Sequence, residues 1–101
     1  MPYLICYDIT GDPLRTKIGK KIIAQGLDRI NKSVYLGSIS ESSLKSLEQD
    51  LKQLIQTKGD PPDSLIILPL TAHEVQQMLV IGLNELDKDD LSGERSTLIF
   101  N

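Results

Sequence analysis

The sequence lacks the features typical of secreted and membrane-spanning proteins. Its single cysteine, Cys6, cannot form an internal disulfide, which favours a reducing, cytoplasmic setting. No apolar run approaches the roughly 20 residues that cross a bilayer. Residues 1–9 carry no basic leader typical of a signal peptide, so we expect no membrane partner.

Several catalytic motifs are also absent. The chain has no Gly-rich phosphate loop, no nucleophile elbow and no HExxH sequence. The lone histidine, His73, has no cysteine or second histidine to complete a zinc site.

Charge is unevenly distributed along the 101 residues, whose net charge is −3. Residues 1–35 hold six basic and three acidic groups, a balance of +3, whereas residues 36–101 hold five basic and eleven acidic groups, a balance of −6. Phosphate binding depends on the local field, so the first third could contact a nucleic-acid backbone. The alternative is that these charges only solvate helix faces.

Local patterns predict a single α+β domain. Apolar, β-branched runs indicate strands, and apolar residues every three or four positions indicate helices. Asp12 before a proline, Ser40 and Thr71 are candidate N-caps, and Gly26 is a candidate left-handed C-terminal cap. The expected elements are strand 3–9, helix 13–25, strand 28–39 (split or paired), helix 40–58, strand 64–70, a short helical turn 71–77, and strands 79–83 and 96–100.

This order suits a ferredoxin-like βαββαβ domain with both helices on one face of an antiparallel sheet. Residues 3–7 and 65–70 are nevertheless apolar on both faces, so the second face also needs a cover. We expect a second copy of the chain to supply it, as a sheet-to-sheet homodimer. Residues 1–101 then form one domain, with a core over 1–78 and C-terminal strands in 79–101 that pair with the partner subunit.

Asp8 is the one polar residue in the first strand, on the same face as Leu4 and Cys6. Two interpretations stay open. The carboxylate could accept hydrogen bonds from the turn at residues 10–11. Alternatively, a twofold axis could bring two copies of Asp8 together, which would require a cation or a shared proton. Mg²⁺ is commonly held by two carboxylates, waters and phosphate oxygens, and could support phosphodiester hydrolysis.

Other candidates are weaker. Arg15, Lys17 and Arg29 could hold phosphate oxygens or could simply be solvated. Tyr7 and Tyr35 could support a site or could only pack in the core.

Several segments resemble the CRISPR-associated protein 2 family in order and spacing. They are the opening YLICYDI (3–9), Arg15 seven positions after Asp8, RINKSVYLG (29–37), the strand end LPL (68–70) and the strand LVIGL (79–83). The resemblance covers essentially the whole chain.

The resemblance implies a homodimer in which Asp8 of each subunit binds a divalent metal, Mg²⁺ or Mn²⁺. Some relatives are metal-dependent endonucleases acting on RNA or DNA, and others bridge integrase dimers on DNA during spacer acquisition. Lys17, Asn31 and Tyr35 stand where the family frequently has arginine, glutamine and phenylalanine. Unlike arginine, the lysine at position 17 cannot bind two phosphate oxygens at once. The positions that match the family's candidate site are Tyr7, Asp8, Arg15, Arg29, Ser33 and Tyr35.

Three functional hypotheses follow. The first is an adaptation subunit that binds duplex DNA with the CRISPR integrase, and the second is a metal-dependent endonuclease that uses Asp8. The third is a ferredoxin-like module for a small ligand or a protein, unrelated to nucleic acid. One carboxylate per chain, with no general base beside it, favours the adaptor role over strong nuclease activity.

Overall fold

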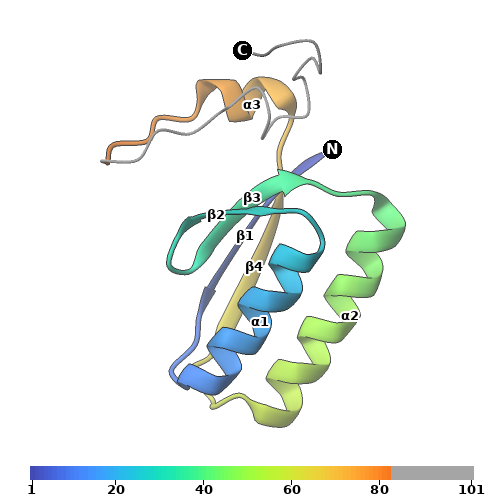
Figure 1. Cartoon of the computed structure of the whole chain (residues 1–101), viewed down its shortest axis with the longest axis vertical. Helices are drawn as coiled ribbons and strands as arrows, with labels where there is room; N and C mark the ends of the chain where they lie inside the picture. The colour runs from blue at the N-terminus through green and yellow to red at the C-terminus, as the bar shows by residue number, and fades with distance from the viewer. Residues whose placement is uncertain (83–101) are drawn as a thin grey trace.

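The computed structural model describes residues 1–82, which form a sheet of four strands and three helices (Figure 1). The strand order is β2-β3-β1-β4, and every neighbouring pair is antiparallel. This is the predicted ferredoxin-like α+β arrangement. The elements are β1 (Pro2–Asp8), α1 (Asp12–Ala24), β2 (Asp28–Asn31), β3 (Val34–Ser38), α2 (Glu41–Lys58), β4 (Ser64–Pro69) and α3 (Ala72–Gln77).

The expected strand 28–39 is a hairpin of β2 and β3, joined by a turn at Lys32 and Ser33. Its register shifts between Arg29 and Asn31, so the strand pairing is irregular close to the turn. The turn ends beside β1, because Val34 at the start of β3 pairs with Cys6 of β1.

The ends of the helices are mostly as predicted. The Ser40 hydroxyl caps α2 by accepting a hydrogen bond from the backbone N–H of Ser43, and Gly26 has a φ of 93°. The prediction that Asp12 is the N-cap of α1 is wrong. Gly11 occupies that position, and Asp12 lies in the first helical turn, where its carboxylate pairs with Arg15.

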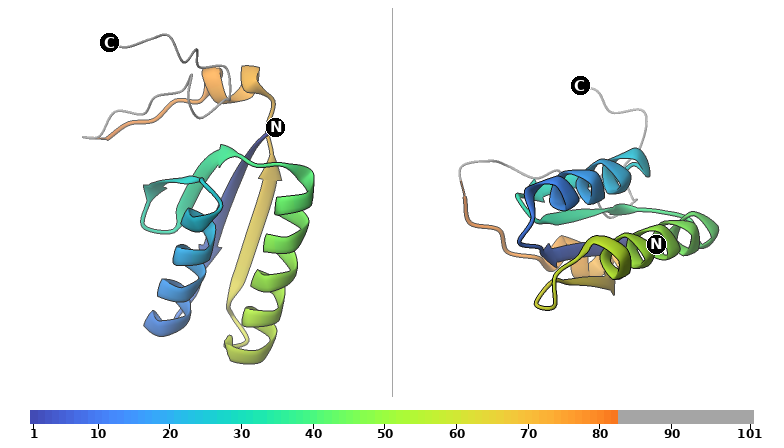
Figure 2. Two further views of the ribbon diagram at one scale, coloured as in Figure 1. Left: turned by 45° about the vertical axis from the view of Figure 1, so that its right-hand side comes forward. Right: turned by 90° about the horizontal axis from the view of Figure 1, so that it is seen from below.

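Helices α1 and α2 lie side by side over one face of the sheet (Figures 1 and 2). Inward-facing residues of β1 and β3 meet the apolar stripes of both helices there, so this layer is the main core. Among its most deeply buried side chains are Ile5, Ile18, Ile22, Tyr35, Leu47 and Leu51.

The other face of the sheet is covered at one end only. Val75 of α3 packs on Leu36 of β3, and both side chains are fully buried. Farther along this face, Ile66 and Leu68 of β4 are 59% and 48% exposed, and Ile66 is the cross-strand neighbour of Cys6. Among residues 1–82, therefore, nothing covers much of the second apolar face.

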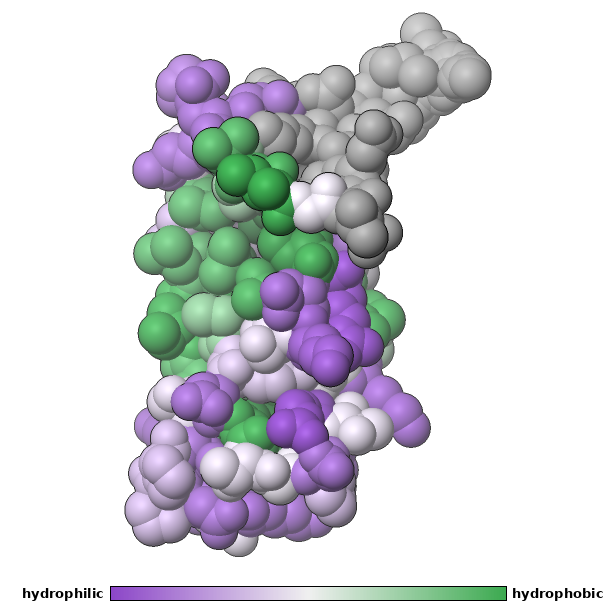
Figure 3. All heavy atoms as spheres, turned by 90° about the vertical axis from the view of Figure 1, so that its left-hand side faces the viewer, coloured by the Kyte–Doolittle hydropathy of each residue, from purple (hydrophilic) through white to green (hydrophobic). Residues whose placement is uncertain are grey.

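The C-terminal part of the described chain adds more exposed apolar surface. Residues 79–82 form no strand within this chain, and Leu79 and Ile81 are 82% and 90% exposed. Figure 3 shows hydrophobic side chains gathered over the upper part of one side of the molecule and hydrophilic ones over the lower part. The predicted strand 96–100 lies outside the described residues, and strand exchange stays a prediction.

Candidate functional site

A hollow of about 560 Å³ lies between α1, the end of β1 and the β2–β3 hairpin. These segments meet because β1 leads directly into α1, and the hairpin turn lies beside the last residues of β1. Six of the seven predicted site residues line it, and Lys17 is the exception. They are Tyr7, Asp8, Arg15, Arg29, Ser33 and Tyr35.

The hollow is rich in positive charge although the protein is acidic. Arg15 and Lys20 line it from α1, Arg29 and Lys32 line it from the hairpin, and Asp8 is its one acidic lining residue. Lys20 and Lys32 form no ion pair with any residue in the described part of the chain. This local excess of cations suits an anionic ligand.

Sequence reasoning counted Lys20 and Lys32 among the basic groups but did not select them for the site. Helical spacing could have found Lys20, because Thr16, Gly19, Lys20 and Ile23 share one face of α1 and all line the hollow. Lys32 could be placed only once the hairpin turn was known.

The two arginines differ in how they are held. Arg15 donates from Nη1 to the carbonyl oxygen of Ile9 at 3.0 Å, and its Nη2 pairs with the Asp12 carboxylate. Arg29 has no acidic partner among residues 1–82, and its Nη2 donates to the carbonyl oxygen of Lys32 at 3.2 Å. The positive charge of Arg29 is therefore less neutralised than that of Arg15.

Two tyrosines form the floor of the hollow. The Oη atoms of Tyr7 and Tyr35 are 3.2 Å apart, and the Tyr7 hydroxyl also donates to the carbonyl oxygen of Lys32 at 3.4 Å. Burial raises the pKa of Tyr7 to about 12, although nearby Arg29 opposes the shift. Tyr7 is therefore protonated near neutral pH and acts as a hydrogen-bond donor, not as a base.

Gly19 allows α1 to lie directly on this pair. A Cβ atom at Gly19 would be 2.7 Å from the Tyr35 Oη and 3.6 Å from the Tyr7 Oη. The first distance is shorter than van der Waals contact permits. The two tyrosine hydroxyls therefore pack directly against the backbone of α1 at Gly19.

Asp8 is the last residue of β1 and is exposed. It follows Cys6 on the open face of the sheet and pairs in register with Ser64 of β4. The interpretation that the turn at residues 10–11 bonds to Asp8 is wrong. The backbone N–H of Thr10 donates to Asp63 Oδ1 at 3.0 Å instead, so within residues 1–82 this N–H leaves the Asp8 carboxylate unbonded.

The neighbouring acidic cluster has a different role. Asp63 accepts hydrogen bonds from the backbone N–H groups of Asp60 and Thr10, and these bonds lower the pKa of Asp63. The Thr10 hydroxyl lies 3.0 Å from Asp60 Oδ2 and 3.1 Å from Asp63 Oδ1, so the two carboxylates share its one proton. These bonds tie the loop after β1 to the loop before β4.

Residues 1–82 do not make a complete metal site by themselves. Residues 1–82 contain no group of three or more His, Cys, Asp or Glu side chains able to ligate an ion. Asp8 is nevertheless a hard oxygen donor, exposed at the unpartnered face and next to the cations of the hollow. Its chemistry fits Mg²⁺ or Mn²⁺ if a second Asp8 and phosphate oxygens complete the shell.

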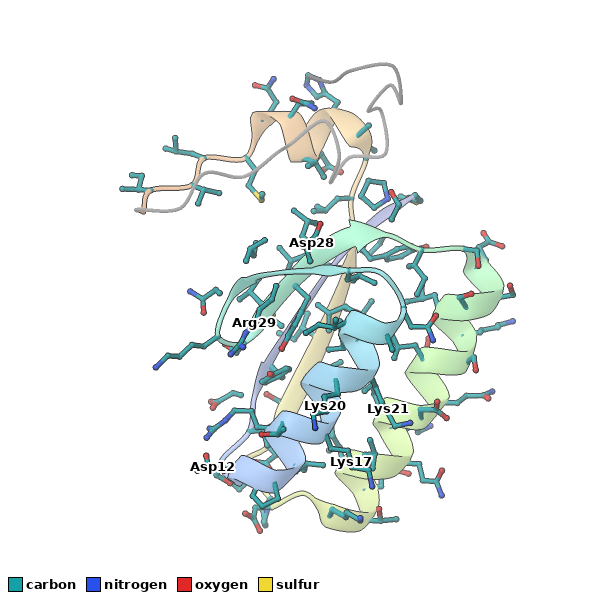
Figure 4. All side chains as sticks on the ribbon, in the orientation of Figure 1. Asp12, Lys17, Lys20, Lys21, Asp28 and Arg29 are labelled. Atoms are coloured by element: carbon teal, nitrogen blue, oxygen red, sulfur yellow. The ribbon has the colours of Figure 1, made fainter. Side chains whose placement is uncertain are left out.

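Lys17 lies outside the hollow. Figure 4 shows Lys17 and Lys21 extending from α1 toward α2. The side-chain contact of Lys17 with Lys58, and then the charge of Lys58, lower the pKa of Lys17. Lys21 reaches Asp50 at 3.8 Å. A nucleic-acid contact by Lys17 would therefore be separate from the one centred on Arg29.

Within residues 1–82, no helix is long and apolar enough to span a membrane.

Comparison with known proteins identifies relatives over most of the chain. The family model described as "CRISPR associated protein Cas2" matches residues 1–78. A protein of Pyrobaculum aerophilum named "CRISPR-associated endoribonuclease Cas2 2" is 41% identical over 82 residues, which cover 81% of this chain and 87% of the relative. A Korarchaeum cryptofilum protein named "CRISPR-associated endoribonuclease Cas2" is 32% identical over 79 residues, covering 78% and 82%.

Two solved structures share the fold. Streptococcus pyogenes Cas2, in a crystal structure at pH 6.5, superposes with a TM-score of 0.70 at 22% identity, covering 81% of this chain and 100% of that one. A hypothetical protein from Thermus thermophilus gives a TM-score of 0.68 at 27% identity, covering 84% and 94%.

Proposed function

Because this chain belongs to the CRISPR associated protein Cas2 family, we propose that it acts in a CRISPR system as a homodimeric, metal-dependent nuclease that binds a nucleic-acid backbone. The observation that carries the proposal is an exposed carboxylate, Asp8, at a hollow lined by four cationic side chains. The relatives from Pyrobaculum aerophilum and Korarchaeum cryptofilum are named endoribonucleases, which supports the same class of reaction.

The hollow suits phosphates better than bases. Its cations can neutralise phosphate oxygens, and the guanidinium of Arg29 can bind two of them at once. The aromatic rings of Tyr7 and Tyr35 are only 7% and 2% exposed, so neither offers a platform on which a base could stack. We therefore expect binding that is strongly salt-dependent and tolerant of sequence.

The metal would be held by Asp8 from each subunit, together with waters and phosphate oxygens. Bound there, it would supply a Lewis acid for the phosphodiester and a more acidic water. The residues of the chain do the positioning: Arg29 and Lys20 hold the backbone, and the unpartnered sheet face beside Ile66 and Leu68 brings the subunits together.

A second function is favoured by what the hollow lacks. Its lining residues include no histidine, and Tyr7 keeps its proton near neutral pH, so the described part of the chain places no general base beside Asp8. In this case the protein is an adaptation subunit that binds duplex DNA with the CRISPR integrase during spacer acquisition. Co-purification with the integrase encoded at the same locus would test that partnership.

One experiment separates the two functions. Labelled single-stranded RNA and labelled duplex DNA are incubated with wild type, Asp8→Asn and the control Asp28→Asn, with Mg²⁺ or with a chelator. Asp28 is exposed on β2 and does not line the hollow. A nuclease predicts Mg²⁺-dependent cleavage that is lost only in Asp8→Asn.

Cleavage that survives in Asp8→Asn would refute the catalytic role. Tight DNA binding without cleavage in any variant would favour the adaptor function. Absence of binding to either polymer would overturn both.

A further inference from the structure

We infer that Tyr7 is a positioning residue: its hydroxyl orients the hairpin turn so that Arg29 points at the bound backbone. The inference rests on the proposed function, since it concerns how that site is held in shape.

The two residues share one acceptor. The carbonyl oxygen of Lys32 receives a hydrogen bond from Arg29 Nη2 at 3.2 Å and another from the Tyr7 hydroxyl at 3.4 Å. Arg29 is exposed on the edge strand β2, whereas Tyr7 is buried near the end of the central strand β1. The Lys32 carbonyl therefore links an exposed cation to a buried tyrosine that lies 25 residues before Lys32 in the sequence.

This link lies where the strand pairing of the hairpin is irregular. Its register shifts between Arg29 and Asn31, next to the turn. The backbone N–H of Tyr7 also donates to the carbonyl oxygen of Ser33 at 3.1 Å, which fixes the start of β3. The Tyr7 hydroxyl donates to the preceding carbonyl, that of Lys32, which also accepts the bond from Arg29.

The direction of the bonds distinguishes the two tyrosines. A carbonyl oxygen has no proton, so the Tyr7 hydroxyl must donate to Lys32, and its one proton is then used. The bond between the hydroxyls must therefore run from Tyr35 to Tyr7. Tyr7→Phe removes the link to the hairpin, whereas Tyr35→Phe leaves it intact and is the matched control.

The test is a double-mutant cycle on nucleic-acid affinity. Wild type, Tyr7→Phe, Arg29→Ala, the double variant and Tyr35→Phe are titrated into labelled single-stranded RNA and duplex DNA, in chelator and at several salt concentrations. Melting curves verify that each variant folds. A set in the Tyr35→Phe background, which leaves no buried hydroxyl unpaired after Tyr7→Phe, keeps the test open if the single variant does not fold.

We expect Tyr7→Phe to raise Kd roughly threefold to tenfold, which is the size of a coupling between contacting residues. It should also flatten the salt dependence by up to about one phosphate contact, a slope change of roughly 0.7 to 0.9. In the Arg29→Ala background Tyr7→Phe should add almost nothing. Tyr35→Phe, which keeps the bond from Tyr7 to Lys32, should raise Kd less than Tyr7→Phe does.

The outcomes separate the two proposals. If Arg29→Ala binds as well as wild type, the backbone site of the proposed function is wrong. If Arg29→Ala weakens binding but Tyr7→Phe does not, the positioning role is wrong. Losses that simply add would show that Tyr7 acts through general stability, and they too would overturn the inference.

Discussion

The junction between Gly19 and the tyrosine pair gives a sharp test of packing. Gly19 is buried inside α1, and a Cβ atom there would lie 2.7 Å from the Tyr35 Oη. Tyr35 is only 2% exposed and is hydrogen-bonded to Tyr7, so its ring has little room to retreat. Gly19→Ala should therefore force the helix and the sheet apart.

Two effects of opposite sign decide the size of the change. Replacing glycine by alanine inside a helix stabilises it by about 1 kcal/mol. Overpacking a well-packed core costs roughly 1–3 kcal/mol. In wild type we expect Gly19→Ala to range from neutral to destabilising by about 2 kcal/mol.

Removing the Tyr35 hydroxyl should turn Gly19→Ala into a stabilising substitution. The nearest remaining atoms would then be the Tyr7 Oη at 3.6 Å and the Tyr35 Cζ at 3.7 Å, which are ordinary contacts. In a Tyr35→Phe background Gly19→Ala should stabilise the fold by about 0.5–1 kcal/mol. The predicted coupling between the two changes is thus about 1–3 kcal/mol.

Urea unfolding of the four proteins measures this coupling. Protomer concentration is kept constant, because association would otherwise shift apparent stability. Tyr35→Phe alone should cost about 1 kcal/mol for the lost hydrogen bond. Equal effects of Gly19→Ala in both backgrounds would refute the steric argument.

Three further predictions follow from burial, charge and capping. Because the pKa of Tyr7 is raised from 10.0 to about 12, its stabilising contribution, up to about 2.7 kcal/mol, is complete below pH 10 and lost as the pH rises toward 12. Unfolding curves measured between pH 10 and 12 should show this loss of stability in the control Tyr3→Phe, which keeps Tyr7, but not in Tyr7→Phe. Ile66→Lys should dissociate the proposed dimer, as measured by light scattering, whereas the control Gln49→Lys, at an exposed position of α2, should not. A wild-type mass of only 11.2 kDa at micromolar concentration would contradict the dimer. Ser40→Ala should lower the free energy of unfolding by about 1 kcal/mol, because α2 loses its cap, and an unchanged urea midpoint would count against that role.

Much of the fold could be predicted because its signals are local. A side-chain cap at Ser40 and a positive φ at Gly26 depend on neighbouring residues alone. The hairpin was harder to place, because its turn residues, Lys32 and Ser33, carry no Gly or Pro signal and interrupt a β-branched run. Asp12 was misplaced by one position, because Gly11 is the N-cap and Asp12 lies inside the first turn of α1, where it pairs with Arg15.

The site was predictable where strand alternation alone decides it. Alternation along β1 places Asp8 on the open face, and the structure agrees. Helix periodicity shows which face of α1 is buried, but not which flank faces the hairpin. For this reason Lys17 was selected and Lys20 was passed over, although only Lys20 lines the hollow.

The arrangement around Asp8 also suggests the direction from which a nucleic acid approaches. On the β4 side of Asp8 lie Asp60 and Asp63, whose carboxylates are engaged with Thr10. On the hairpin side lie the cations that include Arg29. A polyanion is repelled on the first side and attracted on the second, so a backbone that passes Asp8 should be held over the hairpin. This asymmetry explains how a chain with a net charge of −3 can still present an anion-binding site, since the local field, not the total charge, decides where phosphates bind.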